Sequence, residues 1–250
     1  FIHRLVGRLI GVVFLLPFLW FLFTRKLQGV MLRKALFLFA LGGLQGFLGW
    51  FMVKSGLIER TSVSHIRLAI HLITAFFTFG FTFWFALQLM EGKPATKKLP
   101  KSAAWSVTLL AVLVLQLIYG ALVAGLHAGK IYNTFPLMNG AIMPESLWVN
   151  SWGVRNLFDN PGTVQFIHRF FAFTLLFLTG MIYSSIRNST TSGQQRRSVY
   201  FLLAAIGLQF TLGVLTILYH APVVLSSVHQ IGAFFLFMAG LTVAFRFRVD

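Results

Sequence analysis

Four of the seven histidines lie in apolar stretches, each within a short motif that occurs twice in the chain. They are His3, His71, His168 and His229. An ionisable ring inside a lipid bilayer is costly, and such residues usually face the interior of a helix bundle and serve a functional site. Two imidazoles at one depth on different helices can bind one metal ion from opposite sides. The four histidines therefore predict two metal-centred sites.

The available ligands restrict the kind of metal centre. The chain has no cysteine, and none of its long apolar stretches contains Asp or Glu, so a sulfur-rich or oxygen-rich site is excluded. Zinc and copper usually need a third or fourth protein ligand, whereas heme supplies four nitrogens and needs only two axial ligands. Pairs of histidines therefore favour heme. The alternative is that each histidine forms only a hydrogen bond with a neighbouring helix.

Three arginines lie close to the first histidine of each repeat. Arg4 and Arg169 directly follow His3 and His168, and Arg8 lies one helical turn beyond Arg4. A guanidinium group matches a carboxylate in shape and charge, so these residues are candidates to bind heme propionates. The alternative is that their long side chains extend to the membrane interface.

Other polar residues receive structural interpretations. Gln45 and Gln209 repeat within apolar stretches, where a hydrogen bond between helices is the favoured role. Three further histidines do not repeat and lie in gaps between apolar stretches, where we expect them to be solvated: His65, His127 and His220.

The composition identifies the solvent of this protein. Hydrophobic residues make up 57% of the 250 residues and charged residues only 10%, whereas about 25% charged residues is usual for a soluble domain. The chain therefore belongs in a lipid bilayer, and disorder, which needs a polar composition, is excluded. The net charge of +16 does not indicate nucleic acid, because the Lys and Arg residues gather in short gaps between apolar stretches.

Seven apolar stretches are long enough to cross a bilayer core of about 30 Å, which needs roughly 20 helical residues. The fold class that they predict is an all-α integral membrane protein. The predicted spans are 4–23, 35–53, 67–89, 103–125, 162–186, 199–219 and 222–245.

The distribution of basic residues predicts the orientation. Thirteen Lys and Arg lie in three of the gaps and the carboxyl-terminal tail, against five in the alternate gaps. Cytoplasmic loops carry the excess of Lys and Arg, so the first set faces the cytoplasm and the first span starts on the outer side. The longest connection, 126–161, then lies outside, and its length and its Gly, Pro, Asn and Trp content predict an ordered, functional loop.

An internal duplication organises the spans. Three patterns recur in the same order: FIHR at positions 1 and 166, GLQxxLG at 43 and 207, and HxIxAFF at 71 and 229. The first three spans thus correspond to the last three, as two parallel repeats. We expect two pseudo-symmetric four-helix bundles, an amino half of residues 1–92 and a carboxyl half of 93–250. Because the second repeat has a further span and an outer loop before it, we expect an eighth helix and an outer loop before Phe1.

The repeated histidines share one depth. His168 and His229 each lie seven residues after a proline that starts a predicted helix, and Asn160 is the predicted cap before the first of these prolines. His71 lies seven residues after Ser64, another predicted cap. At 1.5 Å per residue these distances correspond to about 10 Å along each helix. The predicted sites therefore lie below the outer surface of the membrane.

The same residues carry a resemblance to a known family. The chain resembles heme A synthase, the Cox15/CtaA family, in the class that lacks paired cysteines. The matching strings are HRLVGRLIG, LQGFLGWFMVKSGL, RLAIHL, AGKIYNTFPLMNG, NLFDNPGTVQFIHR and HQIGA, and they span nearly the whole chain. One departure is His127, at a position where relatives commonly have Asp.

The resemblance implies an eight-helix protein with two heme sites. In this family the carboxyl half holds a heme b cofactor, which corresponds to His168 and His229, and the amino half receives the substrate heme o near His3 and His71. The enzyme oxidises the methyl group at porphyrin C8 to a formyl group, which makes heme a for cytochrome oxidase. The family also has a catalytic Glu three positions before the first histidine, a position that falls immediately before Phe1.

The resemblance also implies partners and a location. The partners are the lipid bilayer, heme o, and, as candidates, heme o synthase and an electron acceptor. The absence of a visible transit peptide favours a bacterial inner membrane over a mitochondrial one.

Two other functions fit the residues: a di-heme cytochrome b that transfers electrons, and a transporter built from parallel repeats. The interrupted pair of short helices typical of such transporters is not visible in the sequence.

Overall fold

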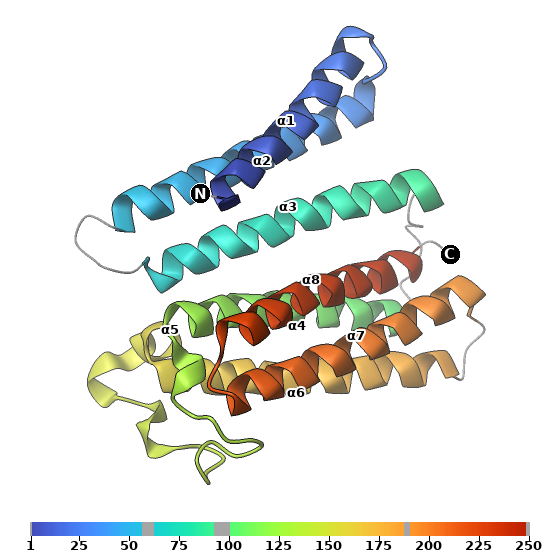
Figure 1. The fold of residues 1–250 in the computed structure, drawn as a ribbon. Helices are drawn as coiled ribbons and strands as arrows, with labels where there is room; N and C mark the ends of the chain where they lie inside the picture. The colour runs from blue at the N-terminus through green and yellow to red at the C-terminus, as the bar shows by residue number, and fades with distance from the viewer. Residues whose placement is uncertain (1, 57–62, 93–100, 188–190, 249–250) are drawn as a thin grey trace.

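The computed structural model describes residues 2–56, 63–92, 101–187 and 191–248, and in these ranges the chain is helical (Figure 1). Seven helices are long and apolar enough to cross a membrane. They are α1 (Ile2–Phe23), α2 (Gly29–Gly56), α3 (His65–Glu91), α4 (Lys101–Gly125), α6 (Pro161–Arg187), α7 (Gly193–Leu218) and α8 (Val223–Arg246). The prediction of an all-α integral membrane protein is confirmed.

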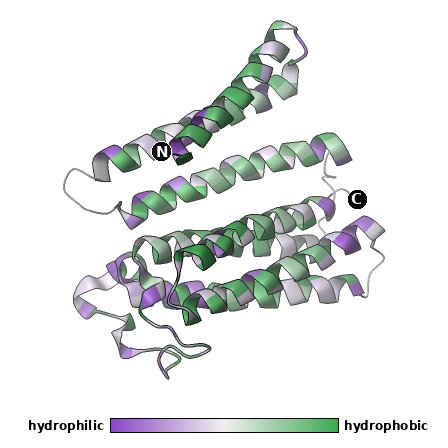
Figure 2. Cartoon of the chain, viewed as in Figure 1, coloured by the Kyte–Doolittle hydropathy of each residue, from purple (hydrophilic) through white to green (hydrophobic). Residues whose placement is uncertain are grey.

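Each long helix contains the core of a predicted span and continues beyond it into polar sequence. Figure 2 shows this pattern, with hydrophobic residues along the helices and hydrophilic residues at their ends and in the outer connection. The start of α7 explains one extension, because Ser192 and Gln195 form a capping box that starts the helix before the apolar stretch. Apolar length therefore locates a span, while local capping decides where its helix begins.

The carboxyl half closes into a ring of four helices. α4 packs against α6 and α8, and α7 packs against the same two helices (Figure 1). α6 and α8 are therefore diagonal neighbours across the bundle. The interior is filled by fully buried aliphatic side chains, including Leu113, Ile182, Val199 and Leu202. Burial of this kind keeps the ring of helices together and fixes the two diagonal helices relative to each other.

The three described helices of the amino half form a row. α1 packs on α2, α2 packs on α3, and α3 lies between α2 and the carboxyl half, where it contacts α4 and α8 (Figure 1). Within the described part of the chain, α1 buries only Phe18, and its exposed side chains are mainly apolar, as suits a surface in contact with lipid. The eighth helix predicted before Phe1 lies outside the described residues.

Two contacts join α3 to the carboxyl half, a close approach of the helices at one end and an ion pair at the other. At the outer end, Gly125 of α4 lies so close to His65 that a methyl group there would come within 2.6 Å of His65 Cβ. At the other end, both carboxylate oxygens of Glu91 accept hydrogen bonds from the Arg246 guanidinium. α3 extends beyond its predicted span to Glu91, so a carboxylate does lie at the end of a long helix, where it is paired.

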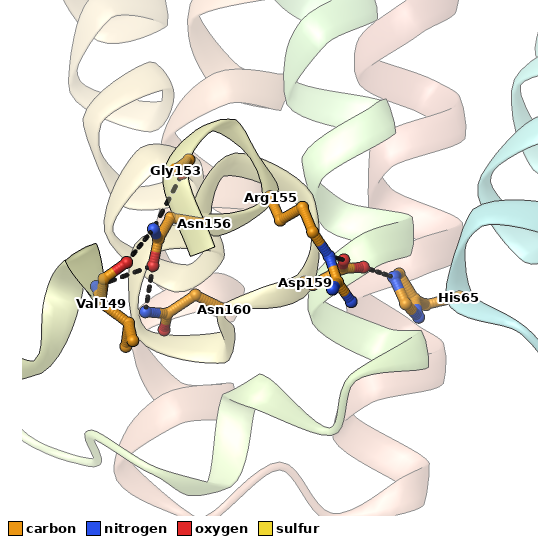
Figure 3. Close-up of polar contacts among 7 residues, drawn as sticks. All are labelled: His65, Val149, Gly153, Arg155, Asn156, Asp159 and Asn160. Atoms are coloured by element: carbon orange, nitrogen blue, oxygen red, sulfur yellow. Dashed lines mark hydrogen bonds and ion pairs between the residues drawn. The ribbon is translucent and has the colours of Figure 1, made fainter. Parts of the chain in front are cut away.

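The outer connection is ordered, as predicted. It contains three short 3-10 helices, Ala128–Lys130, Glu145–Leu147 and Asn150–Arg155, and the one-turn helix α5 (Asn156–Asp159). The fully buried Asn156 bonds both the N–H and the carbonyl of Val149, and Asn160 donates to Asn156 (Figure 3). Asn160 Oδ1 also accepts from the first backbone N–H groups of α6, which confirms the predicted cap.

Substitution of Gly125 tests the close approach of α3 and α4. In Gly125→Ala the added methyl group meets backbone as well as side-chain atoms of His65, so the two helices must separate, at a cost of about 1–3 kcal/mol. We expect a lower midpoint of thermal unfolding in detergent. Gly180→Ala is the control, since no atom lies within 4 Å of the added methyl group. Equal midpoints for the two variants would contradict the contact.

Candidate functional site

The four repeated histidines occupy corresponding helix positions. His71 and His229 are each the seventh residue of their helix and His168 is the eighth, so these three histidines lie at equivalent positions along their helices. His3 is the second described residue of α1. The side chains interact electrostatically in pairs, His3 with His71 and His168 with His229. The structure therefore brings the histidines together within each half.

His229 is held by two residues of the neighbouring helix α7. The Gln209 side-chain nitrogen donates to the His229 backbone carbonyl at 2.9 Å and lies 3.5 Å from Nε2 of the ring. One turn further along α7, a methyl group at Gly213 would lie only 3.0 Å from His229 Cε1. The ring edge therefore rests directly on the α7 backbone, beside the Gln209 carboxamide.

His71 has the same surroundings in the amino half. The Gln45 side-chain nitrogen donates to the His71 carbonyl at 3.1 Å and lies 3.4 Å from Nε2 of the ring. A methyl group at Gly49 would lie 3.0 Å from His71 Cε1. The predicted role of Gln45 and Gln209 in hydrogen bonds between helices is confirmed, and the contact partner in both cases is a repeated histidine.

His168 has a third pair of this kind, which the sequence analysis did not select. The Gln116 side-chain nitrogen of α4 lies 3.3 Å from His168 Nε2, and a methyl group at Gly120 would lie 3.2 Å from Cε1. A signal for this pair was present, because LQxxxG occurs at positions 44, 115 and 208. The duplication did not reveal it, since the helix that contains Gln116 has no counterpart in the described amino half.

The three imidazoles fit the role of axial ligands to an iron porphyrin. Their Nδ1 atoms are buried and have no hydrogen-bond partner among the described residues. A neutral imidazole offers one donor and one acceptor nitrogen, so each ring keeps a polar atom that the protein does not satisfy. The described residues contain no group of three or more His, Cys, Asp or Glu side chains that could hold a bare metal ion. Two histidines per half therefore suit a macrocycle better than an isolated cation.

Arg169 organises the outer connection. Its Nη1 donates to the Thr134 carbonyl at 2.9 Å and its Nη2 to the Tyr132 carbonyl at 2.7 Å, while Gln165 donates to the same Tyr132 carbonyl at 3.0 Å. Arg169 is 8% exposed, and its Nε has no partner within the described ranges. Contact of Arg169 with a propionate stays a prediction, and that contact would have to coexist with these loop bonds.

Phe135 of the outer connection packs on both α6 and α7. Its ring stacks on Phe173 of α6 at 6.1 Å between centroids, and its edge meets Phe210 of α7 at 5.9 Å. Asn133 adds a bond from the same segment to the Ile217 carbonyl of α7. The connection therefore fastens α6 and α7 together, with Asn133 at the end of α7 and Phe135 further along both helices.

The amino-half arginines have a different environment. His3, Arg4 and Arg8 are exposed on α1, and neither arginine forms a hydrogen bond or ion pair within the part of the chain that the structure describes. Their predicted contact with heme propionates stays a prediction.

The prediction that His65 is solvated is wrong. His65 is the first residue of α3, its side chain is mostly buried, and its Nε2 lies 2.9 Å from Asp159 Oδ1 (Figure 3). Asp159 lies far away in the sequence, so the spacing of residues gave no indication of this pair. The other two non-repeating histidines, His127 and His220, are exposed as predicted.

A groove of about 330 Å³ lies between α3 and α8. Its lining contains none of the four repeated histidines, so it does not mark the predicted heme sites. The residues around it are Phe76, Ser227, Gln230, Ile231 and Phe234.

Comparison with known proteins identifies the family of this chain. The sequence profile of the COX15-CtaA family, described as a cytochrome oxidase assembly protein, matches residues 1–241. The chain belongs to this family. The resemblance found in the short strings is therefore confirmed over nearly the whole length.

Individual members of the family are similar to this chain over nearly its whole length. The heme A synthase of Flavobacterium johnsoniae is 41% identical over 239 residues, which are 95% of this chain and 70% of the relative. That of Flavobacterium psychrophilum is 45% identical over 94% of this chain and 69% of its own length. That of Wolbachia pipientis is 42% identical over 96% and 67%, respectively.

The contact between His65 and Asp159 makes the stability of the protein depend on pH in a defined direction. Burial raises the pKa of the Asp159 carboxyl, but hydrogen bonds from Arg155 and His65 outweigh this effect and hold the pKa below its usual value. Because the folded pKa is lowered, the contribution of Asp159 to stability is complete above the pKa of the unfolded chain, about 3.9. It is lost as the pH falls through the lower value of the folded protein.

We expect Asp159→Asn to lower the midpoint of thermal unfolding near neutral pH by about 2–4 °C. The variant should also lose part of the decline that the unmodified protein shows as the pH falls below about 4. Thermal unfolding in detergent across this pH range measures both effects. Glu145→Gln, which removes an exposed carboxylate from the same outer connection, is the control, and an identical pH profile for both variants would refute the role of Asp159.

Proposed function

We propose that this protein is a heme A synthase, which oxidises the C8 methyl group of heme o to a formyl group. The observation that carries the proposal is the pair His168 and His229 on diagonal helices of a closed bundle, in a chain of the COX15-CtaA family. The relatives named heme A synthase support the same reaction. Heme a made in this way is the form used by cytochrome oxidase.

His168 and His229 would hold heme b as a resident cofactor. When bound, heme b supplies an iron that can accept and release an electron. The helices of the carboxyl half form a closed ring, and Arg169 and Phe135 fasten the outer connection over it, an arrangement that suits a group that stays in place. The apolar interior excludes water from the paired imidazoles.

His3 and His71 would bind the substrate heme o in the amino half. His71 has the same Gln and Gly neighbours as His229, so the two halves offer an equivalent ligand to a porphyrin. Arg4 and Arg8 lie on the exposed side of α1, where their guanidinium groups could bind propionates at the membrane interface. The methyl group would be oxidised by successive hydroxylation and loss of water, with its electrons passed to an acceptor. The glutamate that the family places before His3 would accept protons in these steps.

The protein would reside in a bacterial inner membrane, with both sites toward the outer side. The distribution of Lys and Arg supports this orientation, and the seven long apolar helices support a multi-pass protein. A site at this depth allows a hydrophobic heme to arrive through the bilayer. Reduction of the hemes by a membrane-impermeant reductant, added to one side of sealed vesicles at a time, tests the orientation. Access from the cytoplasmic side alone would overturn it.

Loss of a carboxyl-half histidine should remove the cofactor. We expect purified His168→Ala and His229→Ala to lose the low-spin spectrum of heme b, because one axial ligand cannot hold the iron in the same state. Visible spectra and pyridine hemochrome content per protein measure the change. His220→Asn, which alters an exposed histidine at the same side of the membrane, is the control. A normal low-spin spectrum in either alanine variant would exclude these residues as ligands.

Loss of an amino-half histidine should instead reduce the conversion of the substrate, heme o. We expect His3→Ala and His71→Ala to retain heme b and to form much less heme a in a host that supplies heme o. Mass spectrometry of the extracted pigments measures the product. If the intact protein carries two fixed, unmodified hemes and yields no formyl product, the protein is a di-heme cytochrome b rather than a synthase.

A further inference from the structure

A glutamine–glycine pair contacts three of the four repeated histidines, His71, His168 and His229. The pairs are Gln45 with Gly49, Gln116 with Gly120, and Gln209 with Gly213, always four residues apart and always after Leu in the pattern LQxxxG. Each pair lies on the long helix that precedes its histidine helix in the chain: α2 before α3, α4 before α6, and α7 before α8. The recurring unit of this fold is therefore a helix with LQxxxG packed against a helix with a histidine.

The contact to the ring is the feature that all three pairs share. The carboxamide nitrogen lies 3.3 to 3.5 Å from the imidazole Nε2 in each case. A bond to the backbone carbonyl of the histidine is formed by Gln45 and Gln209. If the glutamines served only to join helices, the carbonyl bond would be the constant feature. The constant feature is instead the approach to the ring nitrogen.

This approach selects a tautomer. A carboxamide N–H is a donor, so it pairs with Nε2 only when that atom carries a lone pair and the ring proton is on Nδ1. The one Nε2 lone pair can hold either the carboxamide N–H or iron, so the glutamine keeps this lone pair free of a ring proton until iron takes the place of the N–H. The glutamine thereby prepares the ligand nitrogen before iron arrives, and the Gln45 and Gln209 side chains keep their anchors on the histidine carbonyls.

The glycine fixes the position of the ring. Methyl groups at Gly49, Gly120 and Gly213 would lie 3.0 to 3.2 Å from Cε1 of the corresponding histidine, closer than ordinary van der Waals contact. By contrast, a methyl group at Gly207, two turns earlier on α7, has no atom within 4 Å. On α2 and α7 the close approach is therefore specific to the glycine of the pair, whereas α4 has a second close glycine, Gly125, which meets His65.

We propose that the glutamine–glycine pairs are positioning elements for the iron-binding histidines, which fix the tautomer, the plane and the hydrogen bonding of each imidazole. Neighbours of this kind orient metal ligands, and their loss typically costs roughly 10-fold to 100-fold in metal affinity. They also tune the potential of a bound heme. The proposal rests on the proposed function, because the group positioned is the heme ligand, and it goes further by assigning Gln116 and Gln209 to the properties of heme b.

The test uses the intact protein purified with its heme. We expect Gln209→Leu and Gly213→Ala to change the low-spin ferric electron paramagnetic resonance signal and the midpoint potential of heme b. We also expect them to weaken heme b retention by roughly 10-fold to 100-fold. Gln116→Leu should disturb the same heme through His168. These readouts report the state of the iron and would not move if the residues only joined helices.

Three controls separate positioning from general damage. Thr211→Val removes an exposed polar group from α7 close to Gln209, and Gly207→Ala adds a methyl group to α7 in open space. Both should leave the signal, the potential and the heme content unchanged. Gln45→Leu makes the same change as Gln209→Leu in the other half, so it should leave the heme b signal unchanged while reducing heme a formation.

The outcomes distinguish the two proposals. If Gln209→Leu, Gly213→Ala and Gln116→Leu all keep the heme b content, signal and potential of the unmodified protein, the positioning role is wrong and the heme site stands. If the unmodified protein holds no heme b, the proposed function fails first. Should Gln209→Leu not accumulate in the membrane, Gly213→Ala and Gln116→Leu decide the question, because they act on the same heme from different residues.

Discussion

The structure depends on one constraint: a polar ring placed inside a bilayer must find its partners within the protein. His71, His168 and His229 meet this constraint in the same way, with one nitrogen beside a carboxamide and the ring edge against a glycine of the adjacent helix. The glycines allow the helices to approach closely enough for this contact. The same pairs of residues therefore determine the spacing of the helices and the orientation of each ring. They also leave one nitrogen of each imidazole, Nδ1, without a partner among the described residues.

The two halves use this unit in different settings. In the carboxyl half, two units combine so that their histidine helices, α6 and α8, are diagonal and the two imidazoles lie near enough to influence each other. In the amino half, α2 and α3 form one unit, and α1 contributes His3 from a more exposed position. α3 also packs against the carboxyl half, and the contacts of His65 and Glu91 with Asp159 and Arg246 join the halves at both ends. The internal duplication is thus expressed as repeated contacts as well as repeated sequence.

Much of this could be predicted from the sequence, because the bilayer makes strong demands on it. Among the described residues, apolar length located all seven long helices, and spacing from the predicted caps gave the positions of three histidines along their helices. The role of Gln116 was missed because its partner His168 lies 52 residues away across the outer connection. The pair of His65 and Asp159 was missed for the same reason. Arg169 was predicted to face a propionate, yet which carbonyls it bonds depends on the fold of a loop that no periodicity describes.

The contact of Phe135 with both α6 and α7 affects rates as well as equilibria. A loop whose aromatic ring contacts both helices, and which accepts hydrogen bonds from the buried Arg169, must detach before those two helices can part. Withdrawal would expose apolar surface and break several backbone hydrogen bonds together, so it would be an infrequent, concerted event. A prosthetic group enclosed beneath it would leave slowly whatever its intrinsic affinity. A cofactor that is released slowly from the carboxyl half and a substrate that exchanges in the amino half could then coexist in a single polypeptide.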